Sequence, residues 1–250
     1  VKNLRKVMEE VLRPENFCVS YTGERESLDT VKTQAAEIKK VLFNGQKPEP
    51  VKQAPCVKKN EAFKTSGQVQ YVAQNGNFRK KGLEYTGALE ILKVILSYDY
   101  LWINLRVKGG AYGCMSGFKR NGESFLVSYR DPHLKRTLEV YQGVPDYIRA
   151  FEADEREMTK YIIGTISNKD VPRTPQMQGS ISKTAYFSNV TEDMLQKERN
   201  QILGAQKEDI QKLAALVEAV LSDDQICVVG SETAIEKAED VFMEVKPLIG

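Results

Sequence analysis

An arginine and a tyrosine stand six residues apart around a double glycine in the segment 105–112, whose sequence is LRVKGGAY. Because glycine tolerates positive φ and close backbone approach, the chain can turn sharply at Gly109 and Gly110 while Arg106 and Tyr112 stay at one edge. A guanidinium offers a planar fork of hydrogen-bond donors, and a phenol offers one hydroxyl on a rigid ring. The two side chains together suit holding a carbonyl or a carboxylate of an extended ligand. A tight turn with a solvated Arg106 and a core Tyr112 is the alternative that this spacing leaves open.

The residues that other catalytic centres need are missing from the chain. His133 is the single histidine, and it follows Asp131-Pro132, where a role in a turn or on the surface is expected. Neither HExxH nor HxxEH occurs, and no Cys or carboxylate cluster replaces them, so the sequence predicts no metal site. It also lacks a Walker-type phosphate loop and a G-x-G-x-x-G after a predicted strand. An anion-binding module that uses the N–H groups of the glycine turn stays open as an alternative.

Composition indicates an ordinary globular chain. Of its 250 residues, 41% are hydrophobic and 28% are charged, with a net charge of +2. This near balance of positive and negative charges argues against a nucleic-acid partner. No apolar run reaches the roughly 18 residues of a membrane span. The cysteines form no CxxC pair, so we expect a reducing compartment, either bacterial cytoplasm or an organelle matrix. Two of them, Cys18 and Cys227, lie in predicted apolar strands, where we expect them to be buried.

A repeat joins the two ends of the chain. Residues 1–19 are similar to residues 210–228 at a constant offset of 209 positions. The apolar positions of one amphipathic helix fall on those of the other, and the apolar strand 17–19 falls on 226–228. Each copy is predicted as a helix, a short strand and a second helix. Self-similarity at a fixed offset is typical of a duplicated unit, although such units can also look alike by chance.

The repeat predicts the domain organisation. Residues 1–43 are expected to be the tail of a preceding homologous domain, and residues 61–250 a complete C-terminal αβ domain. Between them, residues 44–60 are rich in proline and lysine and are predicted to be an extended linker. We therefore expect the chain to start partway through a larger protein.

Periodicity predicts the elements that must position the arginine and the tyrosine. Helical spacing runs from Tyr85 to Leu96, just before the Arg106 segment, and Asn121-Gly122 indicates a hairpin directly after it. Asp131-Pro132 is predicted to open a helix. The other predicted elements are a strand at 68–74, helices at 155–166, 176–187 and 191–221, a strand at 225–229 and a last helix. The predicted fold class is α+β, a mainly antiparallel sheet with helices packed on one face.

The segment RVKGGAYG, with its predicted helix before and two strands after, resembles the C-terminal half of the pitrilysin/insulinase-type zinc metallopeptidases. Within that group it is most similar to the presequence-protease branch. The similarity continues through residues 116–118, 128–133 and 171–175 and covers roughly residues 60–250. It implies a metallopeptidase-type αβ domain of the kind found in processing peptidases.

The resemblance also implies roles for the arginine, the tyrosine and the glycines. In such proteins two halves close around an unfolded peptide, and a first domain binds zinc through HxxEH and a distal Glu. The last domain contributes an Arg and a Tyr that hold the substrate backbone. Matched by position, these catalytic and substrate-binding residues are Arg106 and Tyr112, with Gly109 and Gly110 permitting the turn that aims them.

The chain alone is then expected to be inactive. Zinc would be bound by the full-length protein, through ligands outside this chain. The implied partners are a peptide substrate and the N-terminal half of the same polypeptide. A non-catalytic peptidase-like subunit or scaffold is the alternative from another functional class.

Overall fold

The computed structural model describes residues 1–45 and 57–248, and the chain divides into two compact units. The first, here called the helical unit, contains residues Val1–Cys56 and Pro172–Glu192. The second, here called the sheet unit, contains residues Val57–Val171 and Asp193–Gly250. The domain boundaries expected from the repeat remain a prediction, and residues 46–56 of the expected linker lie outside the described residues.

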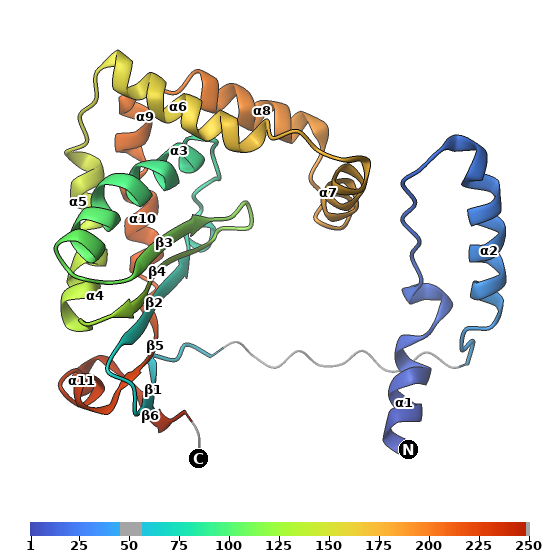
Figure 1. Cartoon of the computed structure of the whole chain (residues 1–250), viewed down its shortest axis with the longest axis horizontal. Coiled ribbons are helices and arrows are strands. Elements are labelled where there is room, and N and C mark those ends of the chain that lie inside the picture. Colours follow the sequence, from blue (N-terminus) through green and yellow to red (C-terminus); the bar gives the residue numbers. More distant parts are fainter. Residues whose placement is uncertain (46–56, 249–250) are drawn as a thin grey trace. The chain divides into compact units, whose positions relative to one another are not determined.

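A six-stranded sheet forms the centre of the sheet unit, with the strand order β3-β4-β2-β5-β1-β6 (Figure 1). Its strands are β1 (Glu61–Thr65), β2 (Gln70–Asn77), β3 (Gly113–Phe118), β4 (Glu123–Asp131), β5 (Gln225–Ser231) and β6 (Glu244–Pro247). The pairs β3–β4, β4–β2 and β2–β5 are antiparallel, whereas β1 pairs in parallel with both β5 and β6. The mainly antiparallel α+β class is therefore confirmed.

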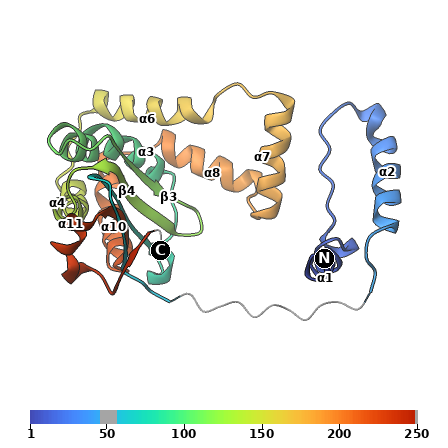
Figure 2. The same cartoon turned by 60° about the horizontal axis from the view of Figure 1, so that its bottom comes forward.

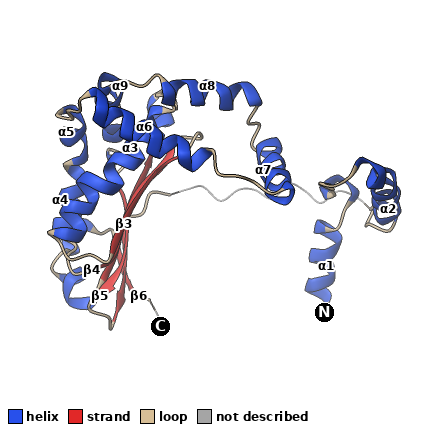
Figure 3. Cartoon of the chain, turned by 45° about the horizontal axis from the view of Figure 1, so that its top comes forward, coloured by secondary structure: helices blue, strands red, loops and turns tan. Residues whose placement is uncertain are grey.

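Helices cover one face of this sheet, and Figure 3 shows α3, α4 and α5 on that face. The helices of the unit are α3 (Ala88–Ile95), α4 (Lys135–Gln142), α5 (Val144–Arg149), α6 (Glu155–Lys169), α8 (Glu192–Leu203), α9 (Lys207–Lys212), α10 (Ala214–Leu221) and α11 (Glu232–Glu236). Burial alternates along β2, β4 and β5 because successive side chains point to opposite faces. Tyr141 of α4 is fully buried and donates its hydroxyl to the carbonyl oxygen of Val72 at 3.1 Å.

The hairpin predicted at Asn121-Gly122 is present. It joins β3 to β4, which run side by side in Figures 1 and 2. Gly122 has a φ of 90°, a conformation that suits glycine in a tight turn. β3 is an edge strand of the sheet. The chain that leaves the preceding helical run therefore enters the sheet at this edge.

The helical unit contains α1 (Lys2–Val11), α2 (Leu28–Lys40) and α7 (Pro175–Phe187). Its α1 has no buried residue: Leu4 is 70% exposed and Val11 is 57% exposed. Their counterparts in the repeat, Leu213 and Val220, are 5% and 1% exposed in the core of the sheet unit. Among the described residues, the apolar side chains of the first copy are therefore exposed, whereas those of the second copy are buried. No helix of the described chain is long and apolar enough to cross a membrane.

Two local predictions were wrong. Residues 17–19 are not a strand, and Cys18 is exposed, because no other strand of the described chain pairs with them. The helix expected at Asp131-Pro132 begins only at Lys135. Asp131 is instead the last residue of β4, with a buried carboxylate that accepts hydrogen bonds from the His133 N–H and the Thr137 hydroxyl.

A helix was expected at the end of the chain, after the strand at 225–229, and a short one is present there. The structure has only the short α11, followed by β6. Val245 pairs with Ala62 of β1 in this strand. Parallel strands need a crossover connection between them, and the short α11 lies within the one that joins β5 to β6.

Candidate functional site

A widened helical run carries Arg106 to the edge of the sheet. After α3 the chain continues through the π-helical turns η4 (Leu96–Tyr100) and η5 (Trp102–Val107), with the Lys108 N–H bonded to the Ile103 carbonyl oxygen at 2.9 Å. π-helical turns are rare and occur frequently at functional sites. Arg106 lies in the last of these turns, one residue from its end.

Both glycines of the following turn are required by geometry. Gly110 has a φ of 78°, which an L side chain rarely adopts. A Cβ on Gly109 would lie 2.4 Å from the Leu105 carbonyl oxygen, closer than real Cβ atoms approach. The turn is closed by hydrogen bonds from the Gly110 and Ala111 N–H groups to the Arg106 and Leu105 carbonyl oxygens, both 2.9 Å long. Glycine at these positions therefore lets the chain reverse directly into β3.

The turn brings Arg106 and Tyr112 together. The Arg106 guanidinium donates a hydrogen bond to the Tyr112 carbonyl oxygen. Its central carbon lies 5.5 Å from the centre of the Tyr112 ring and 4.8 Å from that of Trp102, within cation–π distance. Tyr112 is 57% exposed, so its ring is not a core side chain in this chain.

The Tyr112 ring is supported by its neighbours, whereas its hydroxyl has no hydrogen-bond partner in the part of the chain that the structure describes. The Tyr129 ring lies 5.5 Å away between centres, and the guanidinium carbon of Arg130 lies 5.3 Å from the Tyr112 ring centre. Within the described residues no hydrogen bond is formed by the Tyr112 hydroxyl. A fixed ring with an unused hydroxyl is suited to donate to a ligand.

These side chains line an open hollow of about 570 Å³. Its lining consists of Val69, Trp102, Arg106, Val107, Gly110, Ala111, Tyr112 and Arg130. Three of the four residues predicted from the sequence are among them, and Gly109 lies beside them in the turn. Trp102 and Arg130 were missed. Trp102 stands four residues before Arg106, one helical turn away, so helical spacing could have indicated it.

The chemistry of the hollow is that of donors and apolar walls. None of the described residues that line it is acidic. Cys114 lies two residues beyond Tyr112, and burial raises the pKa of its thiol to about 11, so the reactive thiolate is scarce near neutral pH. Among the described residues, no three His, Cys, Asp or Glu side chains gather in a way that could hold a metal ion. These residues do not fit a zinc ion, and they suit binding and polarising a carbonyl group instead.

The sequence of most of the chain matches a known protein family. The family model described as the PreP C-terminal domain matches residues 60–232. The chain belongs to this family. Protein HypA of Clostridium perfringens is 42% identical over 247 residues, which are 99% of this chain and 25% of that protein. Presequence protease 1, chloroplastic/mitochondrial, of Arabidopsis thaliana is 30% identical over 258 residues, 98% of this chain and 23% of that protein.

The chain spans about a quarter of the length of the curated relatives it matches. Its fold is similar to that of solved peptidase structures. The peptidase M16 inactive domain from Pseudomonas fluorescens has a TM-score of 0.54 at 18% identity, over 90% of this chain and 52% of that one. Pitrilysin has a TM-score of 0.54 at 17% identity, over 80% of this chain and 22% of that one. The resemblance to pitrilysin-type peptidases and to presequence proteases is thus confirmed.

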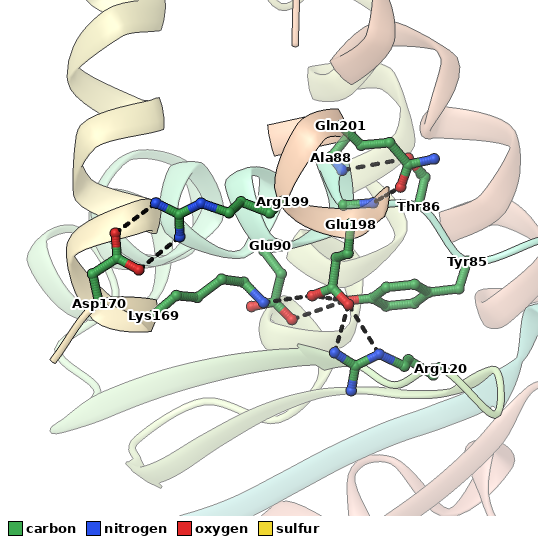
Figure 4. A network of polar contacts seen from close by, with 11 residues as sticks. Tyr85, Thr86, Ala88, Glu90, Arg120, Lys169, Asp170, Glu198, Arg199 and Gln201 are labelled. Carbon is green, nitrogen blue, oxygen red and sulfur yellow. Dashed lines mark hydrogen bonds and ion pairs between the residues drawn. The ribbon is translucent and has the colours of Figure 1, made fainter. Parts of the chain in front are cut away.

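A buried carboxylate lies at the other end of the β3–β4 hairpin of the PreP C-terminal domain. Glu198 of α8 is 3% exposed and forms ion pairs with Arg120 of the hairpin and Lys169 of α6, both 2.5 Å long. Figure 4 shows the Glu198 carboxylate between these two cations, with the Tyr85 hydroxyl beside it. Burial opposes its charge, but the hydrogen bonds from Lys169 and Arg120 hold the pKa of Glu198 below its ordinary value. The cluster ties the hairpin that carries the site to two helices.

Proposed function

We propose that this chain is the substrate-binding C-terminal portion of a zinc metalloendopeptidase that encloses and degrades unfolded peptides. The observation that supports it best is the pairing of Arg106 with Tyr112, which leaves the Tyr112 hydroxyl unbonded within the described chain, beside the open hollow. Membership of the PreP C-terminal domain family supports the same function.

The two side chains have distinct roles in this proposal. Tyr112 donates its hydroxyl to the carbonyl oxygen of the scissile bond or of its neighbour, where negative charge develops in the transition state. Arg106 donates one N–H to the Tyr112 carbonyl oxygen, and its other N–H groups donate to a backbone carbonyl or an acidic group of the peptide. The turn at Gly109 and Gly110 holds both donors at the same edge.

The rest of the active centre lies outside this chain in the proposal. Zinc is bound by residues of the N-terminal half of the same polypeptide, which is also the partner that completes the chamber. Closure of that chamber brings the donors to the peptide only when it is enclosed, and it excludes water. Two relatives are named presequence protease 1 and protein HypA, from a plant organelle and a bacterium, and we propose an organelle matrix or bacterial cytoplasm as the compartment.

Peptidase activity and zinc content test this function directly. An unstructured fluorogenic peptide is incubated with this chain and, in parallel, with its full-length parent, and zinc is measured in both by elemental analysis. We expect an inactive, zinc-free chain beside an active parent that chelators inhibit. Hydrolysis and stoichiometric zinc in the chain alone would overturn the proposal. An inactive, zinc-free parent would favour the non-catalytic subunit or scaffold.

A further inference from the structure

Strand β4 contains a β-bulge opposite β2, beside the hollow, because it has one extra residue there. Gln70 pairs with Asp131 and Val72 pairs with Ser128, so two steps along β2 correspond to three along β4. Within this bulge Arg130 has a φ of 50°, a left-handed conformation that few residues other than glycine adopt. β-Bulges occur frequently next to active sites, where they re-aim a side chain, and such backbone strain persists only where the surroundings impose it.

The bulge places Arg130 against the proposed catalytic tyrosine. Its carbonyl oxygen accepts the Tyr112 N–H at 3.3 Å, and its guanidinium carbon lies 5.3 Å from the centre of the Tyr112 ring. The corresponding distance for Arg106 is 5.5 Å. Two guanidinium groups therefore lie near the Tyr112 ring, and both arginines line the hollow.

No carboxylate neutralises these two charges within the described residues. Neither Arg106 nor Arg130 forms an ion pair there, and the lining of the hollow has no acidic side chain. Asp131 is adjacent in sequence, but its buried carboxylate already accepts from His133 and Thr137. Because both arginines line the same hollow, an anion that binds there is attracted by two positive charges.

We propose that Arg130 and Arg106 form a carboxylate subsite beside Tyr112, so that the bound peptide carries a carboxylate at this position. The subsite rests on the proposed function, because it recognises the peptide that Tyr112 binds. An arginine fork holds a carboxylate through two parallel hydrogen bonds. Trp102 and Val107 supply apolar walls for the flanking residue. The carboxylate belongs either to an acidic side chain or to the C-terminus of the peptide.

Fluorescence provides the test, because Trp102 is the only tryptophan of the chain and lines the hollow. The 250-residue chain is titrated with four unstructured peptides of one sequence, which carry a central glutamate or glutamine and a free or amidated C-terminus. Isothermal titration calorimetry supplies a second readout. We expect the favoured carboxylate to tighten binding about tenfold, the effect of a charge-assisted hydrogen bond. Loss of affinity with glutamine identifies a side-chain carboxylate, and loss on amidation identifies the C-terminus.

Variants assign the preference to Arg130. Arg130→Asn removes the guanidinium but keeps a residue that tolerates positive φ, and Arg130→Gly serves the same purpose if the first variant does not fold. We expect either variant to bind all four peptides with similar affinity. Arg156→Gln removes one exposed charge on α6 and should keep the tenfold preference.

The outcomes separate the subsite from the proposed function. Equal binding of all four peptides by the unaltered chain would overturn the subsite while leaving peptide binding intact. A preference that survives in the Arg130 variants would also overturn it. If none of the peptides binds by either readout, the subsite in this chain is overturned, and the proposed function is then decided by the peptidase assay of the full-length parent.

Discussion

The guanidinium of Arg106 donates a hydrogen bond to the backbone carbonyl oxygen of Tyr112, across the turn that separates them. This side-chain hydrogen bond stabilises the turn in addition to the backbone hydrogen bonds that Gly110 and Ala111 donate. The position of the Tyr112 ring therefore depends on the arginine as well as on the strand that follows. Changes at the two residues should consequently differ in kind: the tyrosine hydroxyl acts on the ligand, whereas the arginine acts both on the ligand and on the turn.

Replacement of Tyr112 by phenylalanine removes the hydroxyl and keeps the ring. We expect Tyr112→Phe to lower kcat/KM of the full-length enzyme by about ten- to a thousandfold, the range for loss of one oxyanion-type donor. The hydroxyl has no hydrogen-bond partner among the described residues. The free energy of unfolding of the isolated chain should therefore change by less than about 0.5 kcal/mol.

Tyr98→Phe is the matched control, because Tyr98 is 72% exposed and does not line the hollow. It should leave kcat/KM unchanged. An unchanged kcat/KM in Tyr112→Phe would remove the catalytic role of this residue.

Replacement of Arg106 by lysine keeps the charge and loses the planar fork. We expect Arg106→Lys to lower kcat/KM of the full-length enzyme, because an ammonium cannot bind the Tyr112 carbonyl and a peptide group with the same geometry. The guanidinium also stacks on Trp102, so the fluorescence spectrum of the single tryptophan should shift in the isolated chain. Wild-type kinetics together with an unshifted spectrum would show that Arg106 is only a surface charge.

The local part of the site could be predicted from the sequence. Arg106, the two glycines and Tyr112 lie within seven consecutive residues, so helical spacing and the conformational needs of a glycine turn suffice to bring them together. Their catalytic and binding roles stay predictions. The hairpin at Asn121-Gly122 was accessible for the same reason, since its turn is set by adjacent residues.

Arg130 could not be predicted, because its position depends on strand pairing. It reaches Tyr112 only through the β3–β4 ladder, and its side chain is aimed by a bulge that is defined against β2, almost sixty residues earlier. Register between distant strands is set by the packing of the whole sheet and not by local pattern. The strand β6 was missed for a similar reason, because it is stabilised by parallel pairing with β1.

The two glycines of the turn should differ in their tolerance of alanine. Gly110→Ala should cost about 1 kcal/mol of the free energy of unfolding, because Gly110 has a φ of 78° but no atom closer than 3.6 Å to an added Cβ. Gly109→Ala should cost about 2–3 kcal/mol, because its Cβ would have to displace the Leu105 carbonyl oxygen. Urea unfolding of the isolated chain, followed by Trp102 fluorescence, measures both.

Gly82→Ala is the control for backbone conformation alone, because Gly82 has a φ of 76° and open space around it. It should match Gly110→Ala. If Gly109→Ala costs no more than Gly82→Ala, close backbone approach does not constrain the turn.

Stability should depend on pH through the buried Glu198. Its pKa is held below the ordinary value by hydrogen bonds from Lys169 and Arg120, against the opposing effect of burial. A group whose pKa is lower in the folded state contributes stability that is fully present above its unfolded pKa and is lost as pH falls through its folded pKa. We expect Glu198→Gln to cost about 2–3 kcal/mol at neutral pH, because it leaves two cations without their buried partner. The difference from wild type should shrink as pH falls below the ordinary titration range of a glutamate, because Glu198 itself then becomes protonated.

Asp170→Asn is the matched control for Glu198→Gln. Asp170 pairs with Arg199 at 2.6 Å, but its side chain is 47% exposed. Exposed pairs contribute about 1 kcal/mol or less, so this variant should cost far less at neutral pH. Urea unfolding of both variants at about pH 7, 5 and 3 decides the matter. Equal costs at neutral pH would show that burial adds nothing to the Glu198 cluster, and a Glu198→Gln cost that persists undiminished at low pH would show that its charge is not the cause.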